Sequence, residues 1–96
     1  MTRTEVLAWL RTRRPAPPPA LRAQIERAVT GATLPLPAHL AELGHALLGK
    51  VASRPEGGRE LALDLLAADA FITYAFEAQA ESDVGGVARL AAGAIA

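Results

Sequence analysis

The sequence predicts an all-α protein, a small bundle of four to five helices around one central apolar helix at about residues 54–81. Strong helix formers, above all Ala, Leu, Arg and Glu, dominate the chain of 96 residues. Residues that favour strands are few and do not alternate with polar residues over the length of a strand. Because 51% of the residues are hydrophobic but only 4% are aromatic, the core must be built mainly from Ala and Leu.

A chain of this length supports one compact core, so we expect a single helical domain over residues 1–96. A short N-terminal helix is expected at about residues 4–13, with Thr2 or Thr4 as its cap. The segment PAPPPA at residues 15–20 predicts a stiff polyproline spacer, whose last prolines can also form the first turn of the next helix.

The spacing of apolar residues predicts the next two helices at about residues 18–29 and about residues 37–52. Pro35 and Pro37 disfavour helix for the leucine before each of them, which places the start of the later helix near residue 37. In that helix five apolar residues fall within about 80° of one another on a helical wheel. We therefore expect it to have one buried face and one wet face.

A fourth helix is predicted from the pattern Ser53-x-x-Glu56, which matches a capping box and places the helix start near Arg54. Two glycines that follow weaken its first turns. We expect this helix to continue to about residue 81, and a last helix, itself weakened by glycines, to follow at about residues 83–94.

The stretch from Leu61 to Ala80 is long enough to cross a membrane, but Asp64, Asp69 and Glu77 lie within it. Each carboxylate would cost roughly 2.5 kcal/mol or more at the centre of a bilayer, so we expect no transmembrane span. The apolar residues lie on two opposite sides of the helix. We therefore expect its neighbours to enclose it at the centre of the bundle.

Asp69 falls inside the apolar band of this helix, at about 80° on a wheel that places Leu61 at 0°. Its neighbours on the wheel are Phe76 and Leu66, so we expect Asp69 to be at least partly buried. A buried carboxylate without a partner is too costly to keep ionised. Thr73, one turn later, is a local donor, and the charged candidates from neighbouring helices are Arg22, Arg27 and Arg89.

Asp69, Thr73 and Glu77 are spaced i, i+4 and i+8 and form a polar stripe on an otherwise apolar helix. Helical bundles present carboxylates to a metal or a substrate in this way. Structural networks also contain such acids, and a structural ion pair or inter-helix hydrogen bond is the favoured interpretation. The alternatives are a solvent-open groove or oligomer seam and, last, a ligand or catalytic site.

His39, Glu42 and His45 form a histidine-containing cluster with poor spacing for a metal. The two steps of three residues carry the chain through about 120°, so the imidazoles diverge, unlike the i, i+4 pair of a helical zinc site. We expect these residues to lie on a solvated face. The sequence has no cysteine and no recognisable nucleophile or phosphate-loop motif, so we expect no metal site, no cofactor and no enzyme activity.

Ten basic and ten acidic residues leave no net charge, which disfavours nucleic-acid binding. A basic arm is a weak alternative because the rest of the chain is acidic; it would use Arg3, Arg11, Arg13 and Arg14. The chain has no cysteine and no continuous apolar run in its first twenty residues. We therefore expect a cytoplasmic protein.

The uneven distribution of charge favours association, either within one chain or between chains. Residues 1–50 carry seven basic and three acidic residues, a net charge of +4, and residues 51–96 carry the opposite excess, −4. For Trp9, packing on the protein's own core is the favoured interpretation, and the apolar tail can be buried within the molecule or against another. The candidate interface consists of apolar residues near the two ends: Trp9, Leu10, Val87, Leu90 and Ile95. We expect a small non-catalytic interaction or accessory module that self-associates or belongs to a larger assembly. The alternative is a small-ligand or metal-binding protein that uses the polar stripe.

Overall fold

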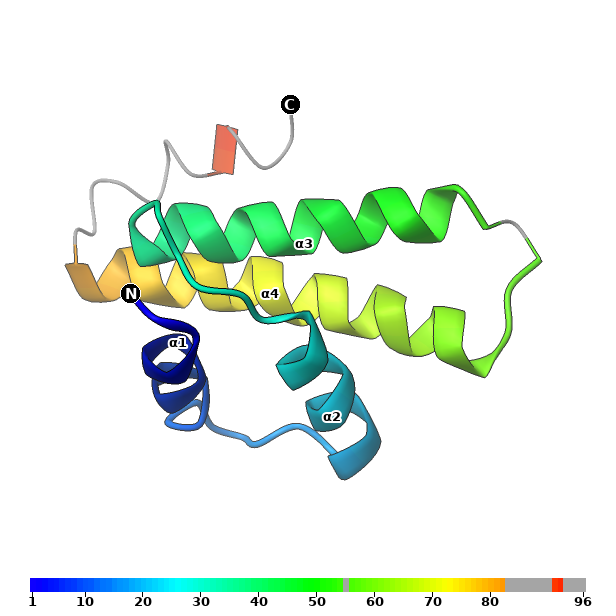
Figure 1. The fold of residues 1–96 in the computed structure, drawn as a ribbon, viewed down its shortest axis with the longest axis horizontal. Helices are drawn as coiled ribbons and strands as arrows, with labels where there is room; N and C mark the ends of the chain where they lie inside the picture. Colours follow the sequence, from blue (N-terminus) through cyan, green and yellow to red (C-terminus); the bar gives the residue numbers. More distant parts are fainter. Residues whose placement is uncertain (55, 83–90, 93–96) are drawn as a thin grey trace.

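The computed structural model describes residues 1–54, 56–82 and 91–92 (Figure 1). These residues form helices and no strand, so the predicted all-α class is confirmed. The predicted last helix, at about residues 83–94, lies almost wholly outside the described residues. The helices are α1 (Arg3–Leu10), α2 (Pro19–Ala28), α3 (Leu36–Ala52) and α4 (Arg59–Ser82).

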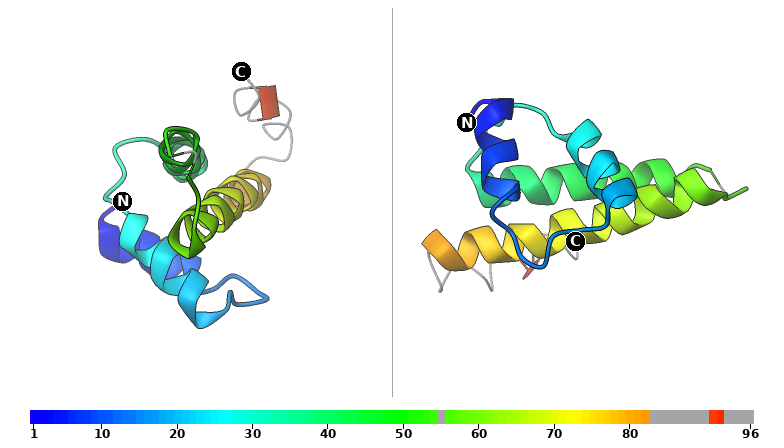
Figure 2. Two further views of the ribbon diagram at one scale, coloured as in Figure 1. Left: turned by 90° about the vertical axis from the view of Figure 1, so that its right-hand side faces the viewer. Right: turned by 90° about the horizontal axis from the view of Figure 1, so that it is seen from below.

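The two long helices, α3 and α4, run antiparallel and pack against each other (Figures 1 and 2). The two short helices lie on the same side of this pair. Of these, α2 packs directly on α4, and α1 reaches α4 through Trp9, whose ring meets that of Tyr74 edge to face at a centroid distance of 6.4 Å. The central position predicted for the fourth helix is therefore confirmed.

A complete capping box begins α1. Thr2 accepts a hydrogen bond from the backbone N–H of Glu5 (3.1 Å), and the Glu5 carboxylate accepts one from the backbone N–H of Thr2 (2.8 Å). Thr2 is thus the cap. The helix ends at Leu10, whereas the sequence predicts that it continues to about Arg13. The backbone N–H groups of Thr12 and Arg13 donate to carbonyls three residues earlier, a tight turn that often ends a helix, and the proline-rich segment beyond cannot continue it.

Prolines set the start of both α2 and α3. Pro18 and Pro35 are the N-caps and have extended backbones, with ψ of 153° and 148°. Pro19 and Pro37 lie in the first turn of the two helices. A proline there loses no hydrogen bond, because the N–H that it lacks would have no partner within the helix. Both helices therefore begin within one residue of the predicted position.

The predicted start of the fourth helix is wrong. Ser53 does not open α4; it is the C-cap of α3, and its hydroxyl donates a hydrogen bond to the carbonyl of Lys50 (2.9 Å). The helix begins only at Arg59, after Gly57 and Gly58. Gly58 has φ +151°, a conformation that other residues rarely adopt, and glycine loses the most conformational freedom on entering a helix. These glycines outweigh the capping pattern.

The buried residues of α4 lie on one face. On a wheel of 100° per residue they occupy an arc of about 120°: Asp64, Ala67, Ala68, Phe71, Tyr74, Ala75 and Ala78. The opposite face is open, and Leu65 and Leu66 are 49% and 52% exposed. The helix is central but not enclosed, which corrects the expectation drawn from its two apolar sides. The reason is that α2 and α3 both pack on the alanine-rich face.

The close contact between α3 and α4 depends on Gly44. An added Cβ at this buried position would stand 2.8 Å from Cδ1 of Ile72 and 3.1 Å from the carbonyl oxygen of Ala68. Glycine therefore lets the backbone of α3 approach that of α4 more closely than any other residue would. At Gly49, farther along α3, an added Cβ would meet no atom within 4 Å.

These two glycines of one helix provide a matched pair of alanine variants. Both substitutions gain the same helix propensity, but only Gly44→Ala forces atoms together. We expect Gly49→Ala to raise the free energy of unfolding by about 0.5–1 kcal/mol, and Gly44→Ala to be less stable than Gly49→Ala by about 1–3 kcal/mol. Urea denaturation followed by circular dichroism measures both. Equal stabilities would contradict the close packing at Gly44.

Candidate functional site

Asp69 is not buried, so the central prediction about this residue is wrong. Both Asp69 and Thr73 are exposed, because they lie on the side of α4 opposite its packed face. The proposed charged partners are engaged elsewhere: Arg22 pairs with Glu26 (3.1 Å), and Arg27 donates to Gln24 (2.9 Å). The third, Arg89, lies outside the described residues.

Glu77, the last residue of the polar stripe, faces the chain segment that follows α1. Its carboxylate lies 3.4 Å from Nη1 of Arg13. The stripe is thus divided: Asp69 and Thr73 face solvent, whereas Glu77 belongs to a contact between the N-terminal segment and α4. The structure gives the three residues no shared buried environment.

The N-terminal part of the candidate interface packs within the chain. Leu10 is buried, and Trp9 is half-buried against α4. Trp9 donates from Nε1 to Glu81 (3.1 Å), and the guanidinium of Arg13 lies 4.1 Å above the Trp9 ring while donating to Glu81 (2.7 Å). We call Trp9, Arg13 and Glu81 the clamp. The other predicted interface residues lie outside the described part: Val87, Leu90 and Ile95.

The pKa values of two side chains in and beside the clamp depart from their ordinary values. The hydrogen bond from Arg13, followed by that from Trp9, lowers the pKa of Glu81. Burial raises the pKa of the Tyr74 hydroxyl, and the nearby charge of Glu77 raises it further. The clamp therefore contains an ionised carboxylate at neutral pH and fastens the end of α1 to the C-terminal half of α4.

His39 is buried, contrary to the solvated position that its pattern predicts. Its Nε2 lies 3.2 Å from the carbonyl oxygen of Thr30 and 3.4 Å from the Thr30 hydroxyl. The segment between α2 and α3 covers this side of α3, which the wheel could not show. Glu42 and His45 are exposed as expected.

The buried acid of α4 is Asp64, which is fully inaccessible to solvent. Nε2 of Gln24 on α2 donates a hydrogen bond to its Oδ1, and Nζ of Lys50 on α3 lies 3.4 Å from its Oδ2. Arg27 in turn donates to the side-chain oxygen of Gln24 (2.9 Å). We call these four residues the Asp64 network, and it joins α2, α3 and α4.

The sequence pattern favoured Asp69 over Asp64 as the buried acid because Asp69 lies between large apolar residues on the helical wheel. On the same wheel Asp64 falls at about 300°, within the arc of small residues that includes Ala67, Ala68 and Ala75. Alanines gathered on one face mark where another helix approaches closely, whereas leucines can remain at the edge of such a contact. The arc of alanines was therefore the feature of the sequence that could have identified Asp64 as the buried acid.

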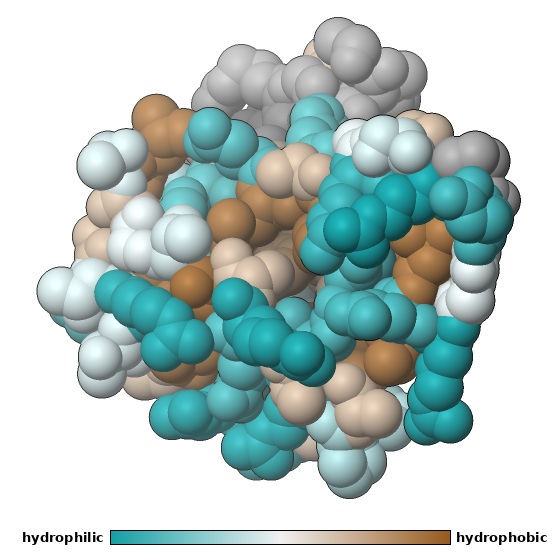
Figure 3. All heavy atoms as spheres, turned by 45° about the vertical axis from the view of Figure 1, so that its right-hand side comes forward, coloured by the Kyte–Doolittle hydropathy of each residue, from teal (hydrophilic) through white to brown (hydrophobic). Residues whose placement is uncertain are grey.

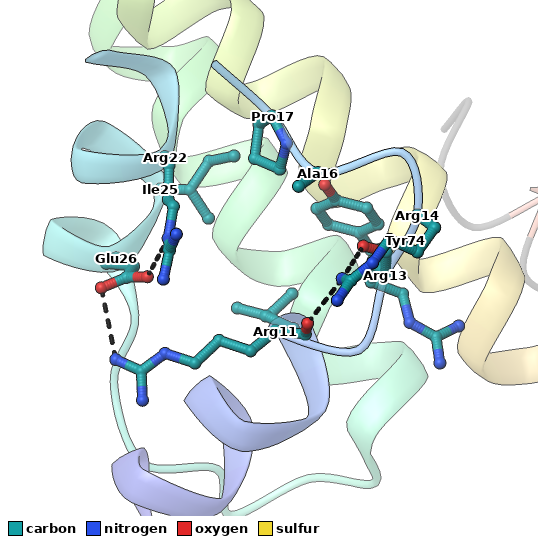
Figure 4. Close-up of a pocket in the computed structure, with 10 residues that line it drawn as sticks. Arg11, Arg13, Arg14, Ala16, Pro17, Arg22, Ile25, Glu26 and Tyr74 are labelled. Atoms are coloured by element: carbon teal, nitrogen blue, oxygen red, sulfur yellow. Dashed lines mark hydrogen bonds and ion pairs between the residues drawn. The ribbon is translucent and has the colours of Figure 1, made fainter. Parts of the chain in front are cut away.

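An arginine pocket lies where the chain leaves α1 and enters α2 (Figure 4). Its volume is about 170 Å³. Buried apolar groups form its floor: Leu10, Ile25 and Tyr74. Four arginines and one glutamate line the pocket around this floor, and the guanidinium of Arg13 is turned away towards α4: Arg11, Arg13, Arg14, Arg22 and Glu26.

The carboxylate does not neutralise the arginine pocket. Glu26 is shared by Arg22 (3.1 Å) and Arg11 (3.4 Å), and the Arg22 hydrogen bond is the main cause of its lowered pKa. Arg14 donates from Nη1 to the backbone carbonyls of Arg11 and Arg13, both at 2.8 Å. Carbonyls hold its guanidinium in place without cancelling its charge. The pocket therefore combines an apolar floor with excess positive charge.

A second candidate surface, which we call the leucine face, lies on α3 and α4, away from α1 and α2. Leu48, Leu65 and Leu66 form it, and each is more than 40% exposed. An open groove of about 280 Å³ runs between the first two and is also lined by Asp69 and Ile72. Figure 3 shows, from one side of the molecule, hydrophobic side chains at the bottom of hollows between hydrophilic ones.

Neither a membrane span nor a metal cluster is present in the described part of the chain. None of its helices combines the length and the apolar character needed to cross a membrane. No three of its histidine and carboxylate side chains gather in a way that could hold a metal ion. Comparisons of the chain with protein-family models, with curated proteins and with solved structures found no match.

The Asp64 network leads to a prediction about stability. We expect Asp64→Ala to lower the free energy of unfolding by about 2–3 kcal/mol, because it leaves the buried Gln24 amide without an acceptor. The loss stays below that of a fully buried ion pair because the Lys50 side chain is 43% exposed and can turn to water. Asp69→Ala is the control and should change stability by less than about 0.5 kcal/mol. Equal losses in urea denaturation would contradict this assignment.

The clamp leads to a prediction about pH. Folding lowers the pKa of Glu81 below its ordinary value of 4.5. Its stabilisation is therefore fully present above that value and is lost as the pH falls through the lower folded pKa. We expect wild type to be more stable than Glu81→Gln at neutral pH, and the difference to disappear in acid. Urea unfolding monitored by Trp9 fluorescence measures this, and a difference independent of pH would contradict it.

Proposed function

We propose that this protein is a small non-catalytic interaction module that associates with a second copy of itself through the leucine face. The observation that carries the proposal is that the three leucines remain 41–52% exposed on the two longest helices. Exposed apolar side chains gathered around a groove mark association surfaces. A non-catalytic role rests on the sequence, which has no cysteine and no recognisable arrangement of nucleophile and base.

A second copy is the occupant that fits this face best. A two-fold interface sets one surface patch against itself, and apolar groups on both α3 and α4 can meet their equivalents in that way. The groove between Leu48 and Leu65 offers each copy a place for a leucine of the other. The opposite net charges of residues 1–50 and 51–96 also favour association between chains.

The energies suggest a weak dimer. Each half-exposed leucine contributes about 1 kcal/mol when its remaining surface is buried, so six leucines from two copies contribute about 6 kcal/mol. This is close to the lower bound of the cost of association, about 4 kcal/mol or more. The dimer should therefore be sensitive to the loss of one leucine.

A cytoplasmic location is part of the same proposal and rests on the absence of cysteine.

The association is tested by light scattering and sedimentation over a range of protein concentrations. Leu65→Lys places a charge inside the proposed contact, and we expect it to weaken dimerisation at least tenfold while the far-ultraviolet circular dichroism stays unchanged. Leu34→Lys is the matched control, because Leu34 is 45% exposed in the segment between α2 and α3 and lies outside the leucine face.

A net gain of about 2 kcal/mol corresponds to a dissociation constant of tens of millimolar, so a wild-type chain whose apparent mass does not rise with concentration in the millimolar range would overturn self-association. Equal weakening by Leu34→Lys and Leu65→Lys would show that added charge, and not the leucine face, controls the oligomeric state. Dimerisation lost only in Leu65→Lys supports the proposal.

A further inference from the structure

We propose that the arginine pocket binds a small organic carboxylate with a compact apolar body. The site is formed by the junction of α1, α2 and α4 and is separate from the leucine face. Three features carry the proposal: an apolar floor, cations that the described acids do not balance, and a volume that limits the size of the ligand.

The floor of the pocket is apolar and well packed. Ile25, Leu10 and Tyr74 are 3%, 8% and 9% exposed, so surrounding side chains hold them firmly and only a small part of each faces the pocket. They come from three different helices, and their packing into one core holds the floor in shape. A hydrophobic group placed on this floor leaves water without displacing a protein side chain.

The cations are held in position but are only partly neutralised. Arg11 and Arg22 share Glu26, so this trio carries one excess positive charge. Arg14 adds a second, because the hydrogen bonds of its guanidinium within the described residues go to uncharged backbone carbonyls. In Figure 4 the Arg14 guanidinium lies beside the ring of Tyr74 and points into the pocket. Arg13 is balanced by Glu81 and Glu77 and points away.

The chemistry of these groups selects a planar anion. A guanidinium presents N–H donors in a rigid fork that matches the two oxygens of a carboxylate. Nη1 of Arg14 bonds to the carbonyls, which leaves the Nη2 and Nε donors of the same group to face a ligand. The carboxylate of the ligand then lies against Arg14, and its apolar body lies on Ile25 and Tyr74.

The size of the pocket limits the ligand further. A cavity of about 150 Å³ is known to accommodate benzene, and pockets for larger, drug-sized ligands measure roughly 300–1,000 Å³. At about 170 Å³ the arginine pocket holds one ring or a short alkyl chain, and any larger part of a ligand would extend into solvent. A small aromatic or short-chain monocarboxylate meets both the charge and the volume.

Titration of the full chain with benzoate, followed by nuclear magnetic resonance of backbone amides, tests the site. We expect saturable shifts at millimolar benzoate or below, centred on residues 10–17 and 22–26, and weaker binding at higher salt. Arg14→Met should weaken the affinity about 10- to 100-fold, the usual effect of losing a hydrogen bond to a charged group. Arg14→Lys keeps the charge and should recover part of the affinity. Arg59→Met, which removes an exposed cation outside the pocket, should have no effect.

Two further probes separate the charge of the ligand from its apolar body. Benzyl alcohol keeps the ring without the charge, and inorganic phosphate keeps the charge without the ring; both should bind at least tenfold more weakly than benzoate. Benzoate shifts that do not saturate, that lie elsewhere, or that persist unchanged in Arg14→Met would overturn the site. Equal binding of either probe would overturn the ligand class. Circular dichroism of each variant shows that a lost signal is not lost folding.

Discussion

The close approach of α3 and α4 at Gly44 is the contact on which the rest of the fold depends. Glycine on α3 and alanines on α4 leave little side-chain volume between the two helices, so their backbones lie near each other. This proximity brings Lys50 of α3 to the carboxylate of Asp64 on α4. It also leaves Leu48 and Leu65 at the edge of the contact, where they remain exposed. One packing constraint therefore explains both a buried acid and an apolar surface.

The two short helices are held to this pair by polar groups as well as by the core. Helices of eight and ten residues are not stable alone, and a small alanine-rich core offers them limited apolar surface. Gln24 fastens α2 through its hydrogen bond to Asp64, and the clamp fastens the end of α1 through Glu81. Arg3 links the start of α1 to the end of α2 by donating to the carbonyls of Glu26 and Val29. Side chains with specific geometry thus determine how α1 and α2 are oriented.

That orientation is what creates the two candidate surfaces. The clamp turns Arg13 towards α4 and places Arg14 beside Tyr74, so a run of arginines in the sequence becomes a pocket with an apolar floor. Because α1 and α2 lie on the same side of the long pair, the leucine face on α3 and α4 is left open. The arginine pocket is positively charged and the leucine face is apolar. The two surfaces are separate, so each can be occupied without the other.

By itself the sequence determined the helical class, the central place of the fourth helix, the choice of Thr2 or Thr4 as the cap of α1, and the starts of α2 and α3. These features depend on local composition, on capping and on proline, whose effects act within a few residues. The position of the buried acid depended on the tertiary structure. Asp64 and Asp69 lie on one helix, about 140° apart around its axis, and both have apolar neighbours in the sequence. Asp64 is buried and Asp69 is exposed because α2 and α3 approach the alanine face of α4. Burial depends on which face a neighbouring helix covers, and the position of a residue on the helical wheel does not determine this.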